Sequence, residues 1–418
     1  MQKQEAAAIR MPQISDEVKV LFPASLDLEK LLRLNALEPF NADGVSFLDE
    51  LSKALNKDSL IRNFPDVATF AFFCRKANIL KLKEQYWKEE LLRLGRGIVF
   101  HIAPSNVPVN FAFSLVCGIL SGNSNVVRIP SKPFEQVDMI CSAIAKLAGT
   151  GKHQQITDRI ALVRYDRQSA ATSWFSSICD VRVIWGGDET IADIRKNPIP
   201  PRAFDITFAD RYSMCIINAD QFVDELYPDK VAAGFYNDTY LFDQNACTSP
   251  HLVVWTGTGD NVNQSRKIFW GMLRKEINRK KYVLQSVSAV DKLTVFFSQA
   301  IESEGIQKAD FNDNLICVNE LKTLPAHIED FRCAGGYFND YHAASLYDIA
   351  AAINRKYQTL SYFGFDYSEF VDFMKTTAPS GIDRIVPIGK TTDFSLIWDG
   401  YDLIRHLSRI IDINRKVS

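Results

Sequence analysis

The chain has 418 residues, of which 47% are hydrophobic and 23% charged, a composition typical of a globular protein long enough for two hydrophobic cores. Its 48 Lys and Arg residues nearly balance its 50 Asp and Glu residues. The resulting net charge of -2 excludes the strong positive field on which binding to nucleic acids or anionic membranes depends. We therefore expect small molecules or proteins as partners, and no nucleic acid.

The cysteines and the N-terminus indicate the compartment. The 8 cysteines are scattered, with no C-x-x-C pair and no Cys/His spacing typical of zinc, so we expect a reducing compartment and no metal site. The first residues lack the apolar stretch of a signal peptide, and the longest apolar run, residues 107–120, is too short to span a bilayer. These observations predict a cytoplasmic protein without a membrane span.

The first part of the chain is predicted to be helical. Residues 1–95 contain charge-rich segments, LDLEKLLRLNAL and KLKEQYWKEELLRLG, whose apolar residues recur at helical spacing. From residue 97 onward, buried strands alternate with helices: GIVFHIA, NVVRIP, IALVRY and VRVIWGG are predicted strands, each followed by a helical pattern. This alternation predicts an α/β fold with a parallel sheet covered by helices.

A second α/β unit is predicted to begin near residue 242. The segment DQNACTSPHLVVW introduces a buried strand, and an amphipathic helix follows over about residues 262–278. We therefore expect four parts: a helical segment over residues 1–95, an α/β domain over 96–241, a second over 242–380, and a C-terminal segment over 381–418.

Several polar residues are predicted at strand ends, where α/β sheets bind ligands. Asn106 follows the first strand, where its amide can stabilise an oxyanion or simply cap the next helix. Arg128 and Lys132 follow the next strand, where they suit the 2′-phosphate of NADP or are solvated surface charges. Gly186 and Gly187 permit close approach of a ligand, but no G-x-G-x-x-G fingerprint follows any predicted strand.

Cys247 differs from the other cysteines because it lies in a polar, turn-like stretch, QNACTSP. A nucleophilic thiol needs access and a lowered pKa, and a loop rich in backbone N–H groups can provide both. Cys117, Cys141 and Cys215 instead fall within apolar segments, where cysteine behaves as a small hydrophobe. A protease-type dyad with His251 stays an alternative, with no motif in its favour.

Taken in order, the segments APSNVPVN, GNSNVVRIPSK, WGGDETI, QNACTSP and DRIVPIGKTTDFSLIWDGYDLI resemble the LuxC-type acyl-CoA reductases. This family is the fatty-acid reductase component of bacterial luminescence systems and belongs to the aldehyde dehydrogenase superfamily. The resemblance runs from about Arg93 to the C-terminus, and its C-terminal segment is the most specific part. It implies that residues 96–241 form a nucleotide-binding domain, that residues 242–380 form a catalytic domain, and that residues 381–418 return to the nucleotide-binding domain or to an oligomer interface.

The resemblance also implies roles for individual residues. Cys247 matches the nucleophile, and Asn106 matches the amide that forms an oxyanion hole with the Cys247 backbone N–H. Ser131 and Lys132 match the end of the motif that contacts the adenosine ribose. Gly186, Gly187 and Glu189 match the turn beside the pyrophosphate and nicotinamide. Arg128, a neighbouring cation, is also an implied cofactor-binding residue. Lys132 stands where oxidising relatives often carry an acidic residue, so the implied cofactor is NADPH.

Two further positions depart from the pattern of oxidising aldehyde dehydrogenases. Phe208 stands where those enzymes carry a water-activating Glu, although a shifted alignment places Asp210 there instead. Gln244 lies three residues before Cys247, displaced from the place of the glutamine usual in the superfamily.

These considerations predict NADPH-dependent reduction of a long-chain acyl-CoA or acyl-protein thioester to the aldehyde, through an acyl-cysteine. Two alternatives stay open: an aldehyde dehydrogenase working in the oxidising direction, and an acyl-accepting subunit of a multienzyme complex. The expected partners are an acyl-protein synthetase or transferase and further copies of the same chain.

Overall fold

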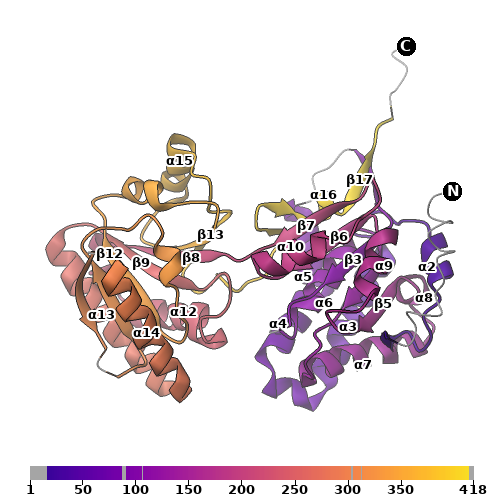
Figure 1. Ribbon diagram of the computed structural model, residues 1–418, viewed down its shortest axis with the longest axis horizontal. Coiled ribbons are helices and arrows are strands. Elements are labelled where there is room, and N and C mark those ends of the chain that lie inside the picture. The colour runs from indigo at the N-terminus through magenta and orange to yellow at the C-terminus, as the bar shows by residue number, and fades with distance from the viewer. Residues whose placement is uncertain (1–16, 87–90, 106, 303–304, 312, 414–418) are drawn as a thin grey trace, which may run out of the picture. The chain divides into compact units, whose positions relative to one another are not determined.

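The computed structural model describes residues 17–86, 91–105, 107–302, 305–311 and 313–413. The chain forms two compact units (Figure 1): residues 1–209 with 394–418, and residues 210–393. The first unit is therefore discontinuous in sequence, and the second is inserted within it.

The first unit is built on a six-stranded sheet of order β1-β5-β4-β3-β6-β7, in which β1 is antiparallel and the other strands are parallel. Its strands are β1 (Lys19–Phe22), β3 (Ile98–Ile102), β4 (Ser124–Arg128), β5 (Ile160–Arg164), β6 (Val181–Trp185) and β7 (Phe204–Phe208). Its helices are α2 (Leu28–Arg33), α3 (Ala42–Lys57), α4 (Pro65–Phe73), α5 (Lys76–Tyr86), α6 (Asn110–Leu120), α7 (Glu135–Gly149), α8 (Gln154–Thr157), α9 (Ala171–Ile178), α10 (Asp188–Arg195) and α16 (Leu403–His406).

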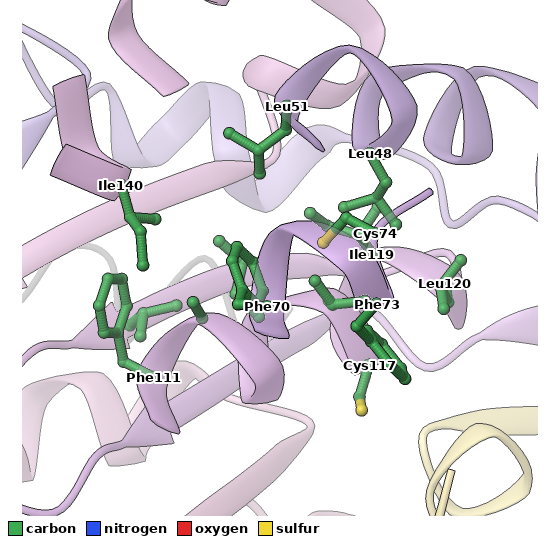
Figure 2. Packing of buried hydrophobic residues seen from close by; sticks show 14 of the residues in the cluster. Leu48, Leu51, Phe70, Phe73, Cys74, Phe111, Cys117, Ile119, Leu120 and Ile140 are labelled. Carbon is green, nitrogen blue, oxygen red and sulfur yellow. The ribbon is translucent and has the colours of Figure 1, made fainter. Parts of the chain in front are cut away.

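Alternate residues of these strands pack against two helical layers, as the side-chain period of a strand requires. Val99 and Val127 join the core under α3, α4, α6 and α7, whereas Phe100 and Val126 join the opposite core with α2, α9 and α10. Figure 2 shows the first of these cores, in which the Cys74 and Cys117 thiols lie among leucine, isoleucine and phenylalanine side chains.

The second unit contains a seven-stranded sheet of order β10-β11-β12-β9-β8-β13-β14, parallel except for the edge strand β10. Its strands are β8 (Tyr212–Asn218), β9 (Pro250–Thr256), β10 (Ile306–Asp310), β11 (Cys317–Leu321), β12 (Tyr337–His342), β13 (Tyr357–Phe363) and β14 (Arg384–Pro387). Its helices are α11 (Ala219–Phe222), α12 (Pro228–Thr239), α13 (Gly259–Arg279), α14 (Ser286–Glu302) and α15 (Tyr367–Thr377). Cores again lie on both faces of the sheet, which confirms the predicted α/β class.

The predicted domain boundaries differ from the observed units. The segment from residue 210 to 241 belongs to the second unit rather than the first, because β8 pairs with β9 and β13 at the centre of the second sheet. The expected helical segment over residues 1–95 shares the core of the first unit and contains two strands, β1 and β2 (Leu92–Gly95). The C-terminal residues from Phe394 return to the first unit, where Leu396, Leu403 and Leu407 are buried.

Strand β2 occupies the end of the segment that the sequence predicts to be helical up to residue 95. The predicted helix is therefore wrong for these residues. β2 pairs with β17 (Ser408–Ile411), and β15 (Ile397–Trp398) pairs with β16 (Tyr401–Asp402) in another small ribbon. The strand forms by pairing with β17, and the buried Arg93 guanidinium also donates to Ser408 Oγ, so residues more than 300 apart in sequence fix its conformation.

A buried polar network attaches α6 to the first sheet. His101 on β3 contacts Ser114 Oγ on α6 through Nδ1 at 2.7 Å and Asn125 Oδ1 on β4 through Nε2 at 3.1 Å. Trp185 on β6 donates to the same Ser114 Oγ at 3.1 Å. The helix approaches so closely because Gly118 has no side chain: an added Cβ would overlap Asn125 Oδ1. These contacts attach the middle of α6 to β3, β4 and β6.

Burial lowers the pKa of His101 from 6.5 to about 4. Between these values the unfolded chain binds more protons than the folded chain, so stability is lost as the pH falls through this window. His101→Gln should remove this contribution: between pH 7 and pH 5 the wild type should lose about 2 kcal/mol more unfolding free energy than the variant. Urea unfolding at both pH values measures the difference, with His342→Gln, an exposed histidine, as control. Equal losses in wild type and His101→Gln would contradict the assignment.

Candidate functional site

The carboxyl ends of β3, β4 and β6 lie at one edge of the first sheet. Ile102, the last residue of β3, is in register with Arg128 at the end of β4 and with Ile184 near the end of β6. The predicted cofactor residues follow these strands directly, so the fold brings Arg128, Ser131, Lys132, Gly186, Gly187 and Glu189 to this edge. Asn106 lies outside the described residues. Helix α6 begins at Asn110 with Val109 at its N-cap position.

Two cationic side chains, Arg128 and Lys132, lie at this edge. The first contacts a neighbouring residue and the second is exposed. The Arg128 guanidinium donates to the Tyr165 carbonyl at 3.3 Å and lies 4.8 Å from the centre of the Tyr165 ring. Lys132 and Ser131 are exposed on the loop before α7. Arg128 therefore has a structural contact at the end of β5, whereas the ammonium group of Lys132 is accessible to a ligand.

The glycine turn after β6 has room beside its backbone. Gly186 donates to the Phe208 carbonyl at 3.1 Å, and Gly187 takes the N-cap position of α10. A Cβ added at Gly186 would lie 3.1 Å from the Thr190 side chain, but a Cβ added at Gly187 would meet no described protein atom within 4 Å. Space at Gly187 is thus open to a ligand at a helix N-terminus, where backbone N–H groups favour an anion. Glu189 is exposed in the first turn of this helix.

In the second unit, Cys247 lies in the turn immediately before β9, and its side chain is half-buried. The turn begins with two consecutive non-glycine residues of positive φ, Asp243 at 50° and Gln244 at 60°. Backbone of this kind is held by its surroundings, since residues other than glycine rarely adopt it unaided.

The buried amide of Gln244 holds this turn. Its Oε1 accepts from the backbone N–H groups of Gly336 at 2.8 Å and Tyr337 at 3.1 Å. Its Nε2 donates to the carbonyls of Pro250 at 2.9 Å and Tyr337 at 3.0 Å. All of its strong hydrogen-bonding positions are therefore used to join the turn to the starts of β9 and β12.

A second contact fixes Cys247 itself. Ser213, fully buried on β8, donates from its Oγ to the Cys247 carbonyl at 2.7 Å, and the same Oγ accepts from the Thr359 N–H on β13 at 3.2 Å. The nucleophile candidate is thus attached to three neighbouring strands of the second sheet, and its backbone has little freedom.

Arg384, at the start of β14, places a positive charge within electrostatic range of this turn. Its guanidinium donates to the carbonyls of Thr391 at 2.6 Å, Lys390 at 3.0 Å and Asp393 at 2.6 Å. Burial lowers the pKa of Arg384, while the negative charges of Asp393, Asp238 and the Cys247 thiolate oppose this effect. Arg384 therefore interacts electrostatically with Cys247.

Comparisons with known proteins identify the family. The family model described as Acyl-CoA reductase (LuxC) matches residues 24–410. This chain belongs to the LuxC family of acyl-CoA reductases. The long-chain acyl-protein thioester reductase of Aliivibrio fischeri is 24% identical over 331 residues, covering 77% of this chain and 64% of the relative. The Vibrio harveyi protein of the same name is 23% identical, covering 76% and 63%. The matched region thus spans slightly less than two thirds of these relatives.

Solved structures confirm the aldehyde dehydrogenase fold. A variant of Thermus thermophilus 1-pyrroline-5-carboxylate dehydrogenase is similar with a TM-score of 0.60 and 11% identity, covering 88% of this chain and 80% of that one. Aldehyde dehydrogenase 21 from Physcomitrella patens gives a TM-score of 0.56 at 11% identity, covering 86% and 79%. At this level of identity the likeness concerns the fold.

At the position predicted to lack the water-activating Glu, the structure has a stacked pair of aromatic side chains. Phe208 ends β7 and is almost fully buried, stacked on Trp185 with ring centroids 3.6 Å apart and planes 14° apart. Asp210, the alternative base, belongs to the second unit and forms an ion pair with Arg332 at 3.1 Å. Its carboxylate is therefore already engaged by a guanidinium.

His251 does not fit a protease-type dyad. Its ring is buried on β9, with Nδ1 3.1 Å from the Cys333 carbonyl, and it stacks on Tyr212. Burial, and then the charge of Arg332, lower its pKa from 6.5 to about 3. The imidazole is neutral and donates its Nδ1 proton to a backbone carbonyl, which gives it a structural role.

The remaining cysteines separate into buried and partly exposed groups. Burial raises the pKa of Cys117 and Cys215, and raises that of Cys141 to about 12, in agreement with their predicted role as small hydrophobes. Cys333 is half-buried like Cys247, and sequence reasoning gave it no role. It is the natural reference thiol for any labelling of Cys247.

Sequence reasoning also missed the residues that hold the turn. Gln244 was noted only as a displaced family residue, while Ser213 and Arg384 lie in other strands far along the chain. Among the described residues, no group of three or more His, Cys, Asp or Glu side chains is arranged to hold a metal ion. In the same part of the chain, no helix is long and apolar enough to cross a membrane.

Proposed function

We propose that this chain reduces an acyl thioester to the corresponding aldehyde, with Cys247 carrying the acyl group. The observation that supports this proposal most strongly is the combination of an accessible thiol and a rigid turn: Cys247 is half-buried, while Gln244 and Ser213 fix the backbone around it. A nucleophile held in this way is oriented for attack before the substrate arrives.

In the proposed first step, the Cys247 thiolate attacks the thioester carbonyl. Arg384 stabilises the thiolate, and Asn106 with the Cys247 N–H receives the negative charge that develops on the carbonyl oxygen. The tetrahedral adduct then expels the carrier thiol as a thiolate, leaving an acyl group on the Cys247 sulfur. The carrier is coenzyme A or a protein-bound thiol, since the long-chain relatives are named for acyl-protein thioesters.

We propose NADPH as the cofactor of the second step. The residues at the edge of the first sheet suit it: the open space at Gly187 can take the pyrophosphate, and the exposed Lys132 can meet a 2′-phosphate. When bound, the nicotinamide supplies a hydride to the acyl carbon. Cys247 then leaves as the thiohemiacetal collapses, which returns the free thiolate and releases the aldehyde.

Reduction is favoured over oxidation by the environment of Phe208. An oxidising dehydrogenase hydrolyses its acyl-enzyme with water activated by a base. Here the corresponding position carries a buried aromatic stack, and Asp210 is paired with Arg332. The rival proposal is an acyl-accepting subunit that works beside an acyl-protein synthetase or transferase. A measurement of NADPH binding distinguishes the two roles, because such a subunit needs no NADPH.

The first test concerns the nucleophile. Incubation with radiolabelled acyl-CoA should give a thioester-linked label on the wild type and on Cys333→Ala, and none on Cys247→Ala. Cys333 is the matched control because it is the other half-buried thiol among the eight cysteines. Label retained by Cys247→Ala, or lost by Cys333→Ala, would refute the proposed step.

The cofactor preference can be tested at two positions of the first unit. Lys132→Glu should raise the KM for NADPH more than about tenfold, on the order of 1.4 kcal/mol, and affect NADH much less, because only NADPH carries the 2′-phosphate. Gly187→Ala should weaken the binding of NADPH and of NADH equally. It should not lower Tm, because the added Cβ meets no described protein atom. If Lys132→Glu impairs both cofactors alike, the lysine is structural and Arg128 becomes the candidate.

The fate of the acyl-enzyme tests the direction of the reaction. Isolated acyl-enzyme should persist without cofactor and release aldehyde when NADPH is added, because Phe208 stands at the position of the water-activating base. Phe208→Glu should accelerate release of the free acid, while Phe208→Gln, of similar size but without a base, should not. Rapid acid release by the wild type that is lost in Asp210→Asn would instead identify Asp210 as the base.

A further inference from the structure

The residues that follow β14 form a loop held by a carboxylate and a guanidinium. We call these residues, 389–393, the 389–393 loop. Asp238, fully buried on α12, accepts from the backbone N–H groups of Gly389 at 2.6 Å and Thr391 at 3.0 Å. The Arg384 guanidinium donates to three carbonyls of the same loop, at 2.6, 3.0 and 2.6 Å. Asp238 therefore binds the donors of the loop, and Arg384 binds its acceptors.

Helix α12 allows the loop to approach closely. Gly234 lies one turn before Asp238 on the same face of this helix. A Cβ added at Gly234 would lie 3.2 Å from the Gly389 Cα, and a Cβ added at Gly389 would lie 3.0 Å from the Gly234 Cα. The two backbones are thus in contact. The loop therefore packs on α12 at two points, the glycine contact and the Asp238 carboxylate.

Arg384 is connected through the second sheet to the turn that carries Cys247. In the pairing of β13 with β14, Arg384 is in register with Thr359. The Thr359 N–H donates to Ser213 Oγ, which donates in turn to the Cys247 carbonyl. Arg384 also interacts electrostatically with Cys247. The position of the 389–393 loop therefore determines where this positive charge stands relative to the candidate nucleophile.

We propose that Asp238 is a positioning residue for the nucleophile: by holding the 389–393 loop, it keeps the Arg384 guanidinium near the turn that carries Cys247. This inference rests on the proposed role of Cys247 as nucleophile. An arginine side chain has many rotamers in solution, and three carbonyls of a fixed loop select one of them. A guanidinium fixed near a thiol favours the thiolate, which is the form that attacks.

The charge of Asp238 and its hydrogen bonds predict opposite effects on Cys247. Burial raises the pKa of Asp238 to about 6, against the effect of the two backbone N–H groups, so the carboxylate is mainly ionised at pH 7. As a negative charge alone, it disfavours a thiolate in its vicinity. By holding the loop, it favours one through Arg384. The ionisable groups that act on Arg384 are Asp393, Asp238 and Cys247.

The rate at which iodoacetamide alkylates Cys247, measured against pH, tests the proposal, with Cys333 as the internal reference thiol. Asp238→Asn keeps the shape but has one acceptor oxygen, so it should raise the midpoint of the profile by about one pH unit and slow alkylation below the midpoint about tenfold. Arg384→Met should give a similar rise, and the double variant no further rise. Asp393→Asn is the matched control: it removes a negative charge, leaves the hydrogen bonds of Asp238 and Arg384 in place, and should not raise the midpoint.

Gly234→Ala is a second variant that leaves Asp238 and Arg384 unchanged, and it decides the question if Asp238→Asn does not fold. Its Cβ presses the loop away from α12, so the midpoint should rise again. Gly271→Ala, whose added Cβ on α13 meets no described atom within 4 Å, should match the wild type.

A midpoint that is unchanged or lowered in folded Asp238→Asn, or in Gly234→Ala, would overturn the inference. So would a double variant whose midpoint exceeds that of Arg384→Met. Because iodoacetamide is not a substrate, such results leave the proposed reduction standing. A wild type that takes no acyl label would instead refute the proposed reduction, while the alkylation profiles still decide whether Asp238 positions Arg384.

Discussion

The four hydrogen bonds of Gln244 are the constraint on which the candidate site depends. The turn that carries Cys247 begins with two non-glycine residues of positive φ, a conformation that an isolated peptide does not maintain. A buried glutamine amide with both ends satisfied compensates for this strain and positions the turn on β9 and β12. The Ser213 contact and the charge of Arg384 act on a backbone that is already fixed.

The two units contribute different chemistry to the proposed reaction. The first unit provides an edge of strand ends with open space at Gly187 and an exposed cation at Lys132. The second provides a thiol with a fixed backbone and a nearby guanidinium.

Local sequence patterns predicted the helices and strands well, but they predicted poorly which strands pair with one another. The alternation from residue 97 predicted β3 to β6 and their helices, because apolar period and turn residues act over short distances. The predicted domain boundary differs from the division at residue 210 because only three residues separate β7 from β8, and hydrophobicity does not tell which sheet a strand joins. The polar turn at Cys247 was visible in the sequence, but the role of Gln244 depends on residues about ninety positions away.

The discontinuous first unit has a consequence for synthesis on the ribosome. Leu396, Trp398, Leu403, Ile404 and Leu407 complete a core whose other buried members precede residue 210. The inserted unit, residues 210–393, therefore leaves the exit tunnel in full before the unit that surrounds it in sequence is complete. During translation the first sheet must wait with part of its hydrophobic surface unfilled until these C-terminal residues emerge, and in that interval the nascent chain is exposed to chaperones and aggregation.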